Sequence, residues 1–229
     1  MAESSKTESK AGHYARLRER FLKGGLDGFH DYEVVELLLK LADPRPDHKP
    51  TAKALLKQFG SLGQVLDASP NLLKETKGVG DKNIFGLKLV QAVASRYLKE
   101  QLPGKDYVTS IEELLNFLKH HLKNRSREQF MLVLLNGRNR ILDLVTLFEG
   151  SLTSSAVYPR EVVKLILDRD AAAVVLVHNH PSGDPLPSQD DQHLTRRILA
   201  ACKTVDVTLR DHLIIAGAEH FSFAENGML

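Results

Sequence analysis

Two histidines separated by one residue follow an apolar run, and a carboxylate comes after them beyond a turn. The stretch is HNHPSGDPLPSQDD at residues 178–191, and AAAVVLV leads directly into it. Alternate side chains of a strand point to the same face, so His178 and His180 face one way and Asn179 faces the other. This spacing lets two imidazole nitrogens reach one metal ion at about 2.0–2.1 Å.

A third ligand is needed, and the turn PSGDPLP directs the chain back towards the histidine pair. Ser188 then opens a helix and places Asp191 in its first turn. Two histidines and one carboxylate are a donor set of catalytic zinc, because the fourth position stays open for water. The competing interpretation is structural, since Ser188-x-x-Asp191 also matches a helix capping box. The two interpretations are compatible, because a cap fixes the start of the helix that carries Asp191.

Other polar residues of this half fit structural roles. His193 lies two residues after Asp191, about 200° around the helix. His212 sits inside a strand pattern and is interpreted as a packed residue. Cys202, in the helical stretch ILAACKTV, is interpreted as core, and Asp184 misses the ligand spacing.

Strands and helices alternate around the histidine stretch. EQFMLVLLNGRNRILDLVTLF at 128–148 predicts two strands joined at Asn136-Gly137, a strong hairpin signal. Further strands are predicted at 171–179, 207–217 and 220–224, with helices at 158–169 and 188–205. This pattern predicts an α/β (α+β) domain over residues 106–229, with a mixed sheet flanked by helices.

The preceding half reads differently. Residues 1–11 are polar and predicted to be disordered, residues 12–101 show helical spacing of apolar residues, and Pro103-Gly104 breaks the linker QLPGKDYVTS. The net charge of +2 is unevenly distributed along the chain. Residues 51–100 have eight Lys/Arg against four Asp/Glu, whereas residues 151–229 have seven against ten. Two parts with different roles are the simplest inference.

Composition excludes several classes of protein. The chain of 229 residues is 42% hydrophobic and 26% charged, as globular proteins are. It has no apolar run of membrane-spanning length and no signal-like N-terminus. Its single cysteine excludes an internal disulfide framework and a cysteine-rich zinc site. We therefore expect a cytoplasmic protein.

A glycine pair marks a hairpin in the helical half. LLKETKGVGDKNIFGLKL at 72–89 resembles a helix–hairpin–helix around Gly78-Val79-Gly80. In DNA-binding examples such glycines bring backbone N–H groups close to a phosphate, and Lys74, Lys77 and Lys82 would add positive charge. Against this, Ile84 stands where a small residue is usual, and Phe85 is the one aromatic nearby. The alternative is a structural or protein-docking module.

The histidine stretch also carries a family resemblance. His178-x-His180, seven residues, Ser188, two residues and Asp191 match the motif of JAMM metalloproteases, and HNHPSGDPLPSQDD, GSLTSSAVYPREV at 150–162 and AAAVVLVHNHPSG resemble the bacterial RadC family. The likeness runs from about Asp106 to Ala224, and the helical half resembles the leading domain of that family. It implies a JAMM/MPN fold, cytidine-deaminase-like, after a helix–hairpin–helix-type domain.

The resemblance implies a role for each matching residue. His178, His180 and Asp191 would bind one zinc ion per chain, and Ser188 would contact the zinc water or the developing oxyanion. JAMM enzymes use a glutamate about 50 residues upstream as general base, and Glu128 stands in that context. Glu149 and Glu161 are the reserves, although Glu161 also suits the first turn of a helix.

Three functions are compatible with the sequence. The first is zinc-dependent hydrolysis of a peptide or isopeptide bond in a protein or peptide substrate. The second is a DNA repair or recombination accessory protein that binds DNA through the helical half, with or without catalysis. The third, a phosphodiesterase, fits least well, because nucleases commonly pair two metals.

Overall fold

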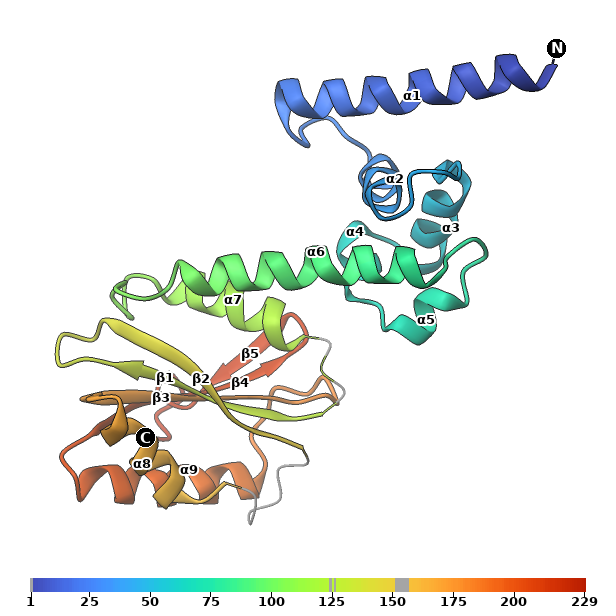
Figure 1. The fold of residues 1–229 in the computed structure, drawn as a ribbon. Coiled ribbons are helices and arrows are strands. Elements are labelled where there is room, and N and C mark those ends of the chain that lie inside the picture. The colour runs from blue at the N-terminus through green and yellow to red at the C-terminus, as the bar shows by residue number, and fades with distance from the viewer. Residues whose placement is uncertain (1, 124, 126, 151–156) are drawn as a thin grey trace. The chain divides into compact units, whose positions relative to one another are not determined.

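The chain packs as two compact units, Met1–Ala94 and Ser95–Leu229. The computed structural model describes residues 2–123, 125, 127–150 and 157–229 (Figure 1). The boundary between the units falls inside a helix, ahead of the linker predicted at 101–110. Of the resemblance at 150–162, residues 151–156 lie outside the described residues.

The first unit is helical, in agreement with the spacing of its apolar residues. Its helices are α1 (Ala2–Gly24), α2 (Asp31–Ala42), α3 (Lys49–Phe59), α4 (Leu62–Asp67), α5 (Pro70–Lys74) and α6 (Asp81–Glu100), the last of which continues into the second unit. Apolar side chains three to four positions apart place Leu39, Leu55 and Leu87 in one fully buried core. No described helix is long and apolar enough to cross a membrane.

Helix α1 corrects one expectation. It begins at Ala2, where the sequence predicts disorder over residues 1–11. Its first turns contain neither Pro nor Gly, and Ala, Glu and Lys are good helix formers. Leu17 is buried and anchors the later turns, and adding residues to an existing helix costs far less than starting one.

The second unit is built on a five-stranded mixed sheet in the order β2-β1-β3-β4-β5. Its elements are α7 (Ile111–Leu122), β1 (Gln129–Leu135), β2 (Ile141–Glu149), α8 (Pro159–Asp168), β3 (Ala173–Asn179), α9 (Gln189–Lys203), β4 (Thr208–Ala216) and β5 (Glu219–Ser222). Neighbouring strands are antiparallel except β3 and β4, which are parallel and joined through α9. The predicted fold class and hairpin are confirmed.

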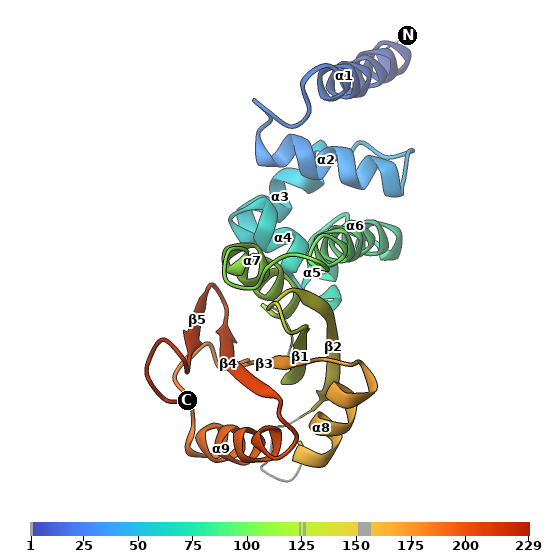
Figure 2. The same ribbon diagram turned by 90° about the vertical axis from the view of Figure 1, so that its left-hand side faces the viewer.

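Helices cover both faces of this sheet. Figure 2 shows α7 on one face and α8 and α9 on the other. Side chains alternate accordingly: Val175 and Val177 of β3 join the core beneath α7, whereas Val174 and Leu176 join the core beneath α8 and α9. The alternation places the next even residue, His178, on the α9 face.

The β1–β2 turn is longer than its Asn-Gly pair suggests. The left-handed residue is Asn139, with φ 57°, rather than Gly137. The Asn136 side chain accepts hydrogen bonds from the backbone N–H groups of Arg138 and Arg140, at 2.9 and 3.0 Å. An asparagine that bonds to the backbone ahead of it therefore closes the turn.

Candidate metal centre

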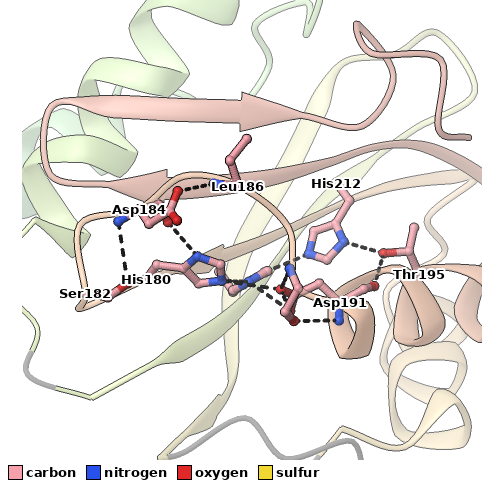
Figure 3. A network of polar contacts seen from close by, with 9 residues as sticks. His180, Ser182, Asp184, Leu186, Asp191, Thr195 and His212 are labelled. Atoms are coloured by element: carbon pink, nitrogen blue, oxygen red, sulfur yellow. Dashed lines mark hydrogen bonds and ion pairs between the residues drawn. The ribbon is translucent and has the colours of Figure 1, made fainter.

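Strand β3 carries the two histidines to its end. His178 is buried against Phe130 of β1, its neighbour in strand register, with ring centroids 6.3 Å apart. His180 follows on the same face and is partly exposed. Figure 3 shows the His180 ring directed towards Asp191 at the start of α9.

Asp191 is held by a capping box. The hydroxyl of Ser188 accepts a hydrogen bond from Asp191 N at 3.1 Å, and Asp191 Oδ2 accepts from Ser188 N at 2.8 Å and from Ser188 Oγ at 2.6 Å. The capping interpretation is therefore confirmed. The same carboxylate also reaches the histidines, so the cap and the candidate metal cluster share one residue.

The ligand atoms of His178, His180 and Asp191 lie within 4.8 Å of one another. His178 Nε2 is 3.0 Å from His180 Nε2 and 3.2 Å from Asp191 Oδ1, and His180 Nε2 is 3.4 Å from Asp191 Oδ2. Nitrogens bound tetrahedrally at about 2.0–2.1 Å lie roughly 3.3 Å apart. The spacing of the three side chains is thus compatible with a single metal ion.

The polar contacts around the cluster support this fit. His180 Nδ1 donates to the carbonyl oxygen of Asp184 at 2.7 Å, because a carbonyl can only accept, and Nε2 of the neutral ring then bears the lone pair. The hydrogen bond with Asp191 raises the pKa of His180, although burial opposes it. Nε2 of His180 is therefore the nitrogen that faces Asp191 and would bind a cation.

Asp191 is ionised in this setting. Burial by itself would raise its pKa, but hydrogen bonds with His178 and His180 outweigh burial and hold the pKa well below its usual value. A buried carboxylate facing two imidazole nitrogens is the chemistry that a divalent cation completes.

Glu128 lies just before β1, two residues ahead of Phe130, which is the register partner of His178. After the hydrogen bond with Asp191, the negative charge of Glu128 is a further contribution that raises the pKa of His180. The Glu128 carboxylate is therefore within electrostatic reach of the cluster. The spacing of 50 residues in the sequence becomes a neighbour relation across β1 and β3.

Asn179 fixes the backbone on both sides of Glu128. Its Oδ1 accepts from Gln129 N at 2.7 Å in a buried contact, and its Nδ2 donates to the Arg127 carbonyl at 3.3 Å. One carboxamide thus spans the two residues that flank Glu128. The sequence predicts only that Asn179 faces away from the histidines.

Of the two reserve glutamates, Glu149 lies at the end of β2 and accepts from Gln129 Nε2 at 3.0 Å, and Glu161 pairs with Arg160 at 3.2 Å in the first turn of α8. Neither belongs to the group of side chains that could hold a metal among the described residues.

Comparison with known proteins agrees with these features. The family model of the RadC-like JAB domain matches residues 108–228, the part that contains the cluster. The chain belongs to the RadC family. It is 42% identical to a UPF0758 protein of Ruegeria pomeroyi, over 95% of this chain and 97% of the relative. It is also 42% identical to a UPF0758 protein of Rhodobacter capsulatus, over 93% of this chain and all of the relative.

The sequence patterns do not predict two residues that make polar contacts behind His178 in this RadC-family site, His212 and Thr195. His212 of β4 is fully buried, as predicted, but its Nε2 lies 2.8 Å from His178 Nδ1. Thr195 Oγ1 lies 2.6 Å from His212 Nδ1. Thr195 stands four residues after Asp191, so helical spacing places both on one face of α9. Burial lowers the pKa of His212 well below its usual value. Cys202 is buried as predicted, which raises its pKa to about 11.

Two polar groups at the glycine hairpin between α5 and α6 have partners within the protein. Gly80 N donates to Asn83 Oδ1 at 3.0 Å, and Lys74 pairs with Asp81 at 3.0 Å. Gly78 has φ 90°, and a Cβ there would lie 2.6 Å from Thr51 Oγ1, so this position requires glycine.

Close helix packing near this hairpin occurs at Gly86 rather than at Ile84. A Cβ at Gly86 would lie 2.5 Å from the Ala42 side chain. The small residue that the motif places four positions after the second glycine thus has its counterpart two positions later. Lys77, Lys82 and Phe85 remain exposed.

Proposed function

We propose that this RadC-family chain is a zinc-dependent hydrolase of peptide or isopeptide bonds. The observation that carries the proposal is the convergence of His178, His180 and Asp191 beside the charge of Glu128. Two imidazoles and a carboxylate are a zinc donor set with one position left open. A bound zinc ion supplies Lewis acidity, which polarises a carbonyl and makes water a nucleophile near neutral pH.

Glu128 is the general base and acid of this proposal. Its carboxylate takes a proton from the attacking water and returns it to the leaving nitrogen, so that the C–N bond breaks and a carboxylate and an amine form. Geometry must hold the base in reach of that water. Asn179 contributes this hold, because it bonds to the peptide groups before and after Glu128.

We assign Ser188 the contact with the developing oxyanion. Its hydroxyl lies at the edge of the cluster and donates to Asp191 Oδ2. In this role the hydroxyl exchanges Asp191 for the oxyanion as negative charge builds on the substrate. The substrate class that follows from this chemistry is a protein or peptide amide.

The test uses the oxygen atom that hydrolysis adds. A cell lysate is incubated with the zinc-loaded chain in H₂¹⁸O, and new amine ends and ¹⁸O-labelled carboxylates are identified by mass spectrometry. We expect Glu128→Gln to lower their formation by about 10²–10⁴-fold while its zinc content stays the same. Glu112→Gln, an exposed glutamate of α7, serves as the matched control. Labelled products that form equally with Glu128→Gln would rule out this base.

A second proposal concerns the helical unit. Exposed Lys77 and Lys82 beside the glycine hairpin support a phosphate contact with DNA. The hydrogen bond from Gly80 N to Asn83 and the Lys74–Asp81 pair weigh against it, because these donors are already used. A salt titration of duplex DNA binding by wild type and by His178→Ala tests it, and this proposal expects equal binding.

A further inference from the structure

A chain of hydrogen bonds through two side chains connects Asp191 with His178, two residues of the candidate metal cluster, through atoms other than their ligand atoms. It starts at the backbone carbonyl of Asp191, passes through Thr195 and His212, and ends at His178 Nδ1. Figure 3 shows Thr195 and His212 on this path. Neither residue belongs to the cluster itself.

The positions of the hydrogens along this line follow from counting donors. Thr195 Oγ1 lies 2.6 Å from the Asp191 carbonyl oxygen and 2.6 Å from His212 Nδ1. Each contact this short requires a hydrogen between its two atoms. The carbonyl has none and the hydroxyl has one, so Thr195 donates to the carbonyl and His212 Nδ1 donates to Thr195.

The state of His212 then decides the state of His178. His212 is fully buried, and its ring nitrogens contact a hydroxyl and an imidazole rather than a carboxylate. A buried imidazolium without a paired charge is costly, so the ring is neutral. Its only hydrogen is on Nδ1, so Nε2 must accept from His178 Nδ1. His178 therefore presents Nε2 to the cluster with its lone pair free.

We propose that Thr195 and His212 are positioning residues that hold His178 in the tautomer whose Nε2 is free to bind the metal. This inference rests on the metal site of the proposed function. His180 obtains the same tautomer from a backbone carbonyl, that of Asp184, beyond the end of β3. His178 lies inside β3, between β1 and β4, where the neighbouring strands pair through their backbones. Side chains from β4 and α9 therefore supply the acceptor.

Aromatic packing covers the faces of both rings, so their polar contacts are confined to the ring nitrogens. Phe130 stacks on His178 at 6.3 Å, and Phe223 stacks on His212 at 4.8 Å. Apolar rings offer no hydrogen-bond acceptor in place of Thr195. Removal of the Thr195 hydroxyl would leave the His212 Nδ1–H buried without a partner, and the ring avoids that cost by moving its hydrogen to Nε2.

The test compares Thr195→Val, which keeps the shape of the side chain, with Thr195→Ser, which keeps the hydroxyl. Long-range ¹H–¹⁵N spectra of the metal-free, ¹⁵N-histidine-labelled chain in alkaline buffer show which nitrogen of His178 carries the hydrogen. We expect Nδ1 in wild type and Thr195→Ser, and Nε2 in Thr195→Val. Zinc affinity, measured by competition with a chromophoric chelator, should fall about 10–100-fold in Thr195→Val and recover in Thr195→Ser.

Ile198→Val on the buried face of α9 is the control for lost packing, and it should leave both measurements unchanged. A wild-type His178 with its hydrogen on Nε2, or a Thr195→Val chain with wild-type tautomer and affinity, would overturn the proposal. The wild-type spectrum requires no variant, so a folding defect does not block the test. Failure of wild type to bind zinc would contradict the proposed function, whereas the metal-free spectrum still decides the tautomer.

Discussion

The end of β3 and the α5–α6 hairpin are both places where the sequence gathers chemically capable residues, but their polar groups are used differently. At the end of β3, two imidazole nitrogens and a carboxylate converge on one another within 4.8 Å. At the hairpin, Gly80 N and the Lys74 ammonium are already bonded to Asn83 and Asp81. The first arrangement is compatible with a bound cation, whereas two of the polar groups of the second already have partners within the protein.

The difference comes from what each region can bury. His178 and Asp191 are fixed by a strand and a helix in the middle of a packed unit, where an unmatched charge is costly. The hairpin lysines are exposed, where solvent completes their hydration at no cost. A motif is therefore a stronger functional signal when its polar groups are buried and converge than when they lie on the surface.

The largest expected difference between the two regions is their response to zinc. At about 1,000 times its dissociation constant, a ligand that binds only the folded state stabilises it by roughly 4 kcal/mol. Hydrogen exchange measured peptide by peptide should slow in β3 and in the first turns of α9. Residues 2–94 should not change, and Asp191→Ala should abolish the effect. If zinc slowed hydrogen exchange equally in both units, the proposed difference between the two regions would be contradicted.

A smaller effect is expected at Asn179, whose side chain bonds to the backbone on both sides of Glu128 and is called the clamp below. Asn179→Ala leaves the buried Gln129 N–H without its acceptor, which costs about 1–3 kcal/mol. Asn179→Asp keeps an acceptor for this group but buries a carboxylate that faces the Arg127 carbonyl oxygen, so it should cost at least as much. Urea-dependent hydrogen exchange of β1 measures both, and a cost below about 0.5 kcal/mol for either variant would argue against the clamp.

Much of this site could be predicted from the sequence, because it depends on local spacing. Strand alternation aligns His178 with His180, and the capping box places Asp191. The position of Thr195 could also be predicted, since it stands four residues after Asp191 on the same helix. The contact of His212 with His178 could not be predicted, because it depends on β4 lying beside β3, and single-sequence patterns do not give strand order.

Other features depend on contacts that spacing does not encode. The clamp made by Asn179 requires β1 to lie beside β3, and the support of His180 comes from a backbone carbonyl that carries no residue signature. Disorder over residues 1–11 was predicted from polarity alone, whereas helix propensity and an adjoining helix extend α1 to Ala2.

The hairpin glycines provide the next prediction. Gly78→Ala should cost about 1–2 kcal/mol of stability, because its φ is positive and Thr51 blocks the new methyl group. Gly80→Ala should stay within about 0.5 kcal/mol, since the nearest atom to its Cβ, Asn83 Oδ1, is 4.0 Å away. Urea unfolding checks both values.

DNA binding by the same pair of variants sharpens the contrast. We expect weak, salt-dependent binding with a Kd of about 10⁻⁴–10⁻⁶ M, unchanged in Gly80→Ala. If Gly80→Ala loses DNA binding at unchanged stability, the Gly80 amide touches a phosphate and the hairpin is a binding site after all.

The smallest expected effect is a pH dependence in the sheet unit. Burial lowers the pKa of His121 to about 4, below its unfolded value of about 6.5. The unfolded chain therefore binds more protons between these values, and stability falls as the pH decreases through this range. Between pH 7 and 5.5 the loss should be about 1 kcal/mol. Urea unfolding of wild type and His121→Gln at both pH values should show a smaller loss in the variant, and equal losses would refute this assignment.

The central claim is that His178, His180 and Asp191 bind a catalytic metal ion, and that Glu128 acts as general base beside the metal without being a ligand. Metal content of the purified chain, measured by mass spectrometry after zinc is offered and excess removed, tests it most directly. We predict about one zinc per chain in wild type and Glu128→Gln, and little in His178→Ala and Asp191→Ala. A wild-type chain that retains no zinc, or alanine variants that retain as much as wild type, would show that the cluster is not a metal site.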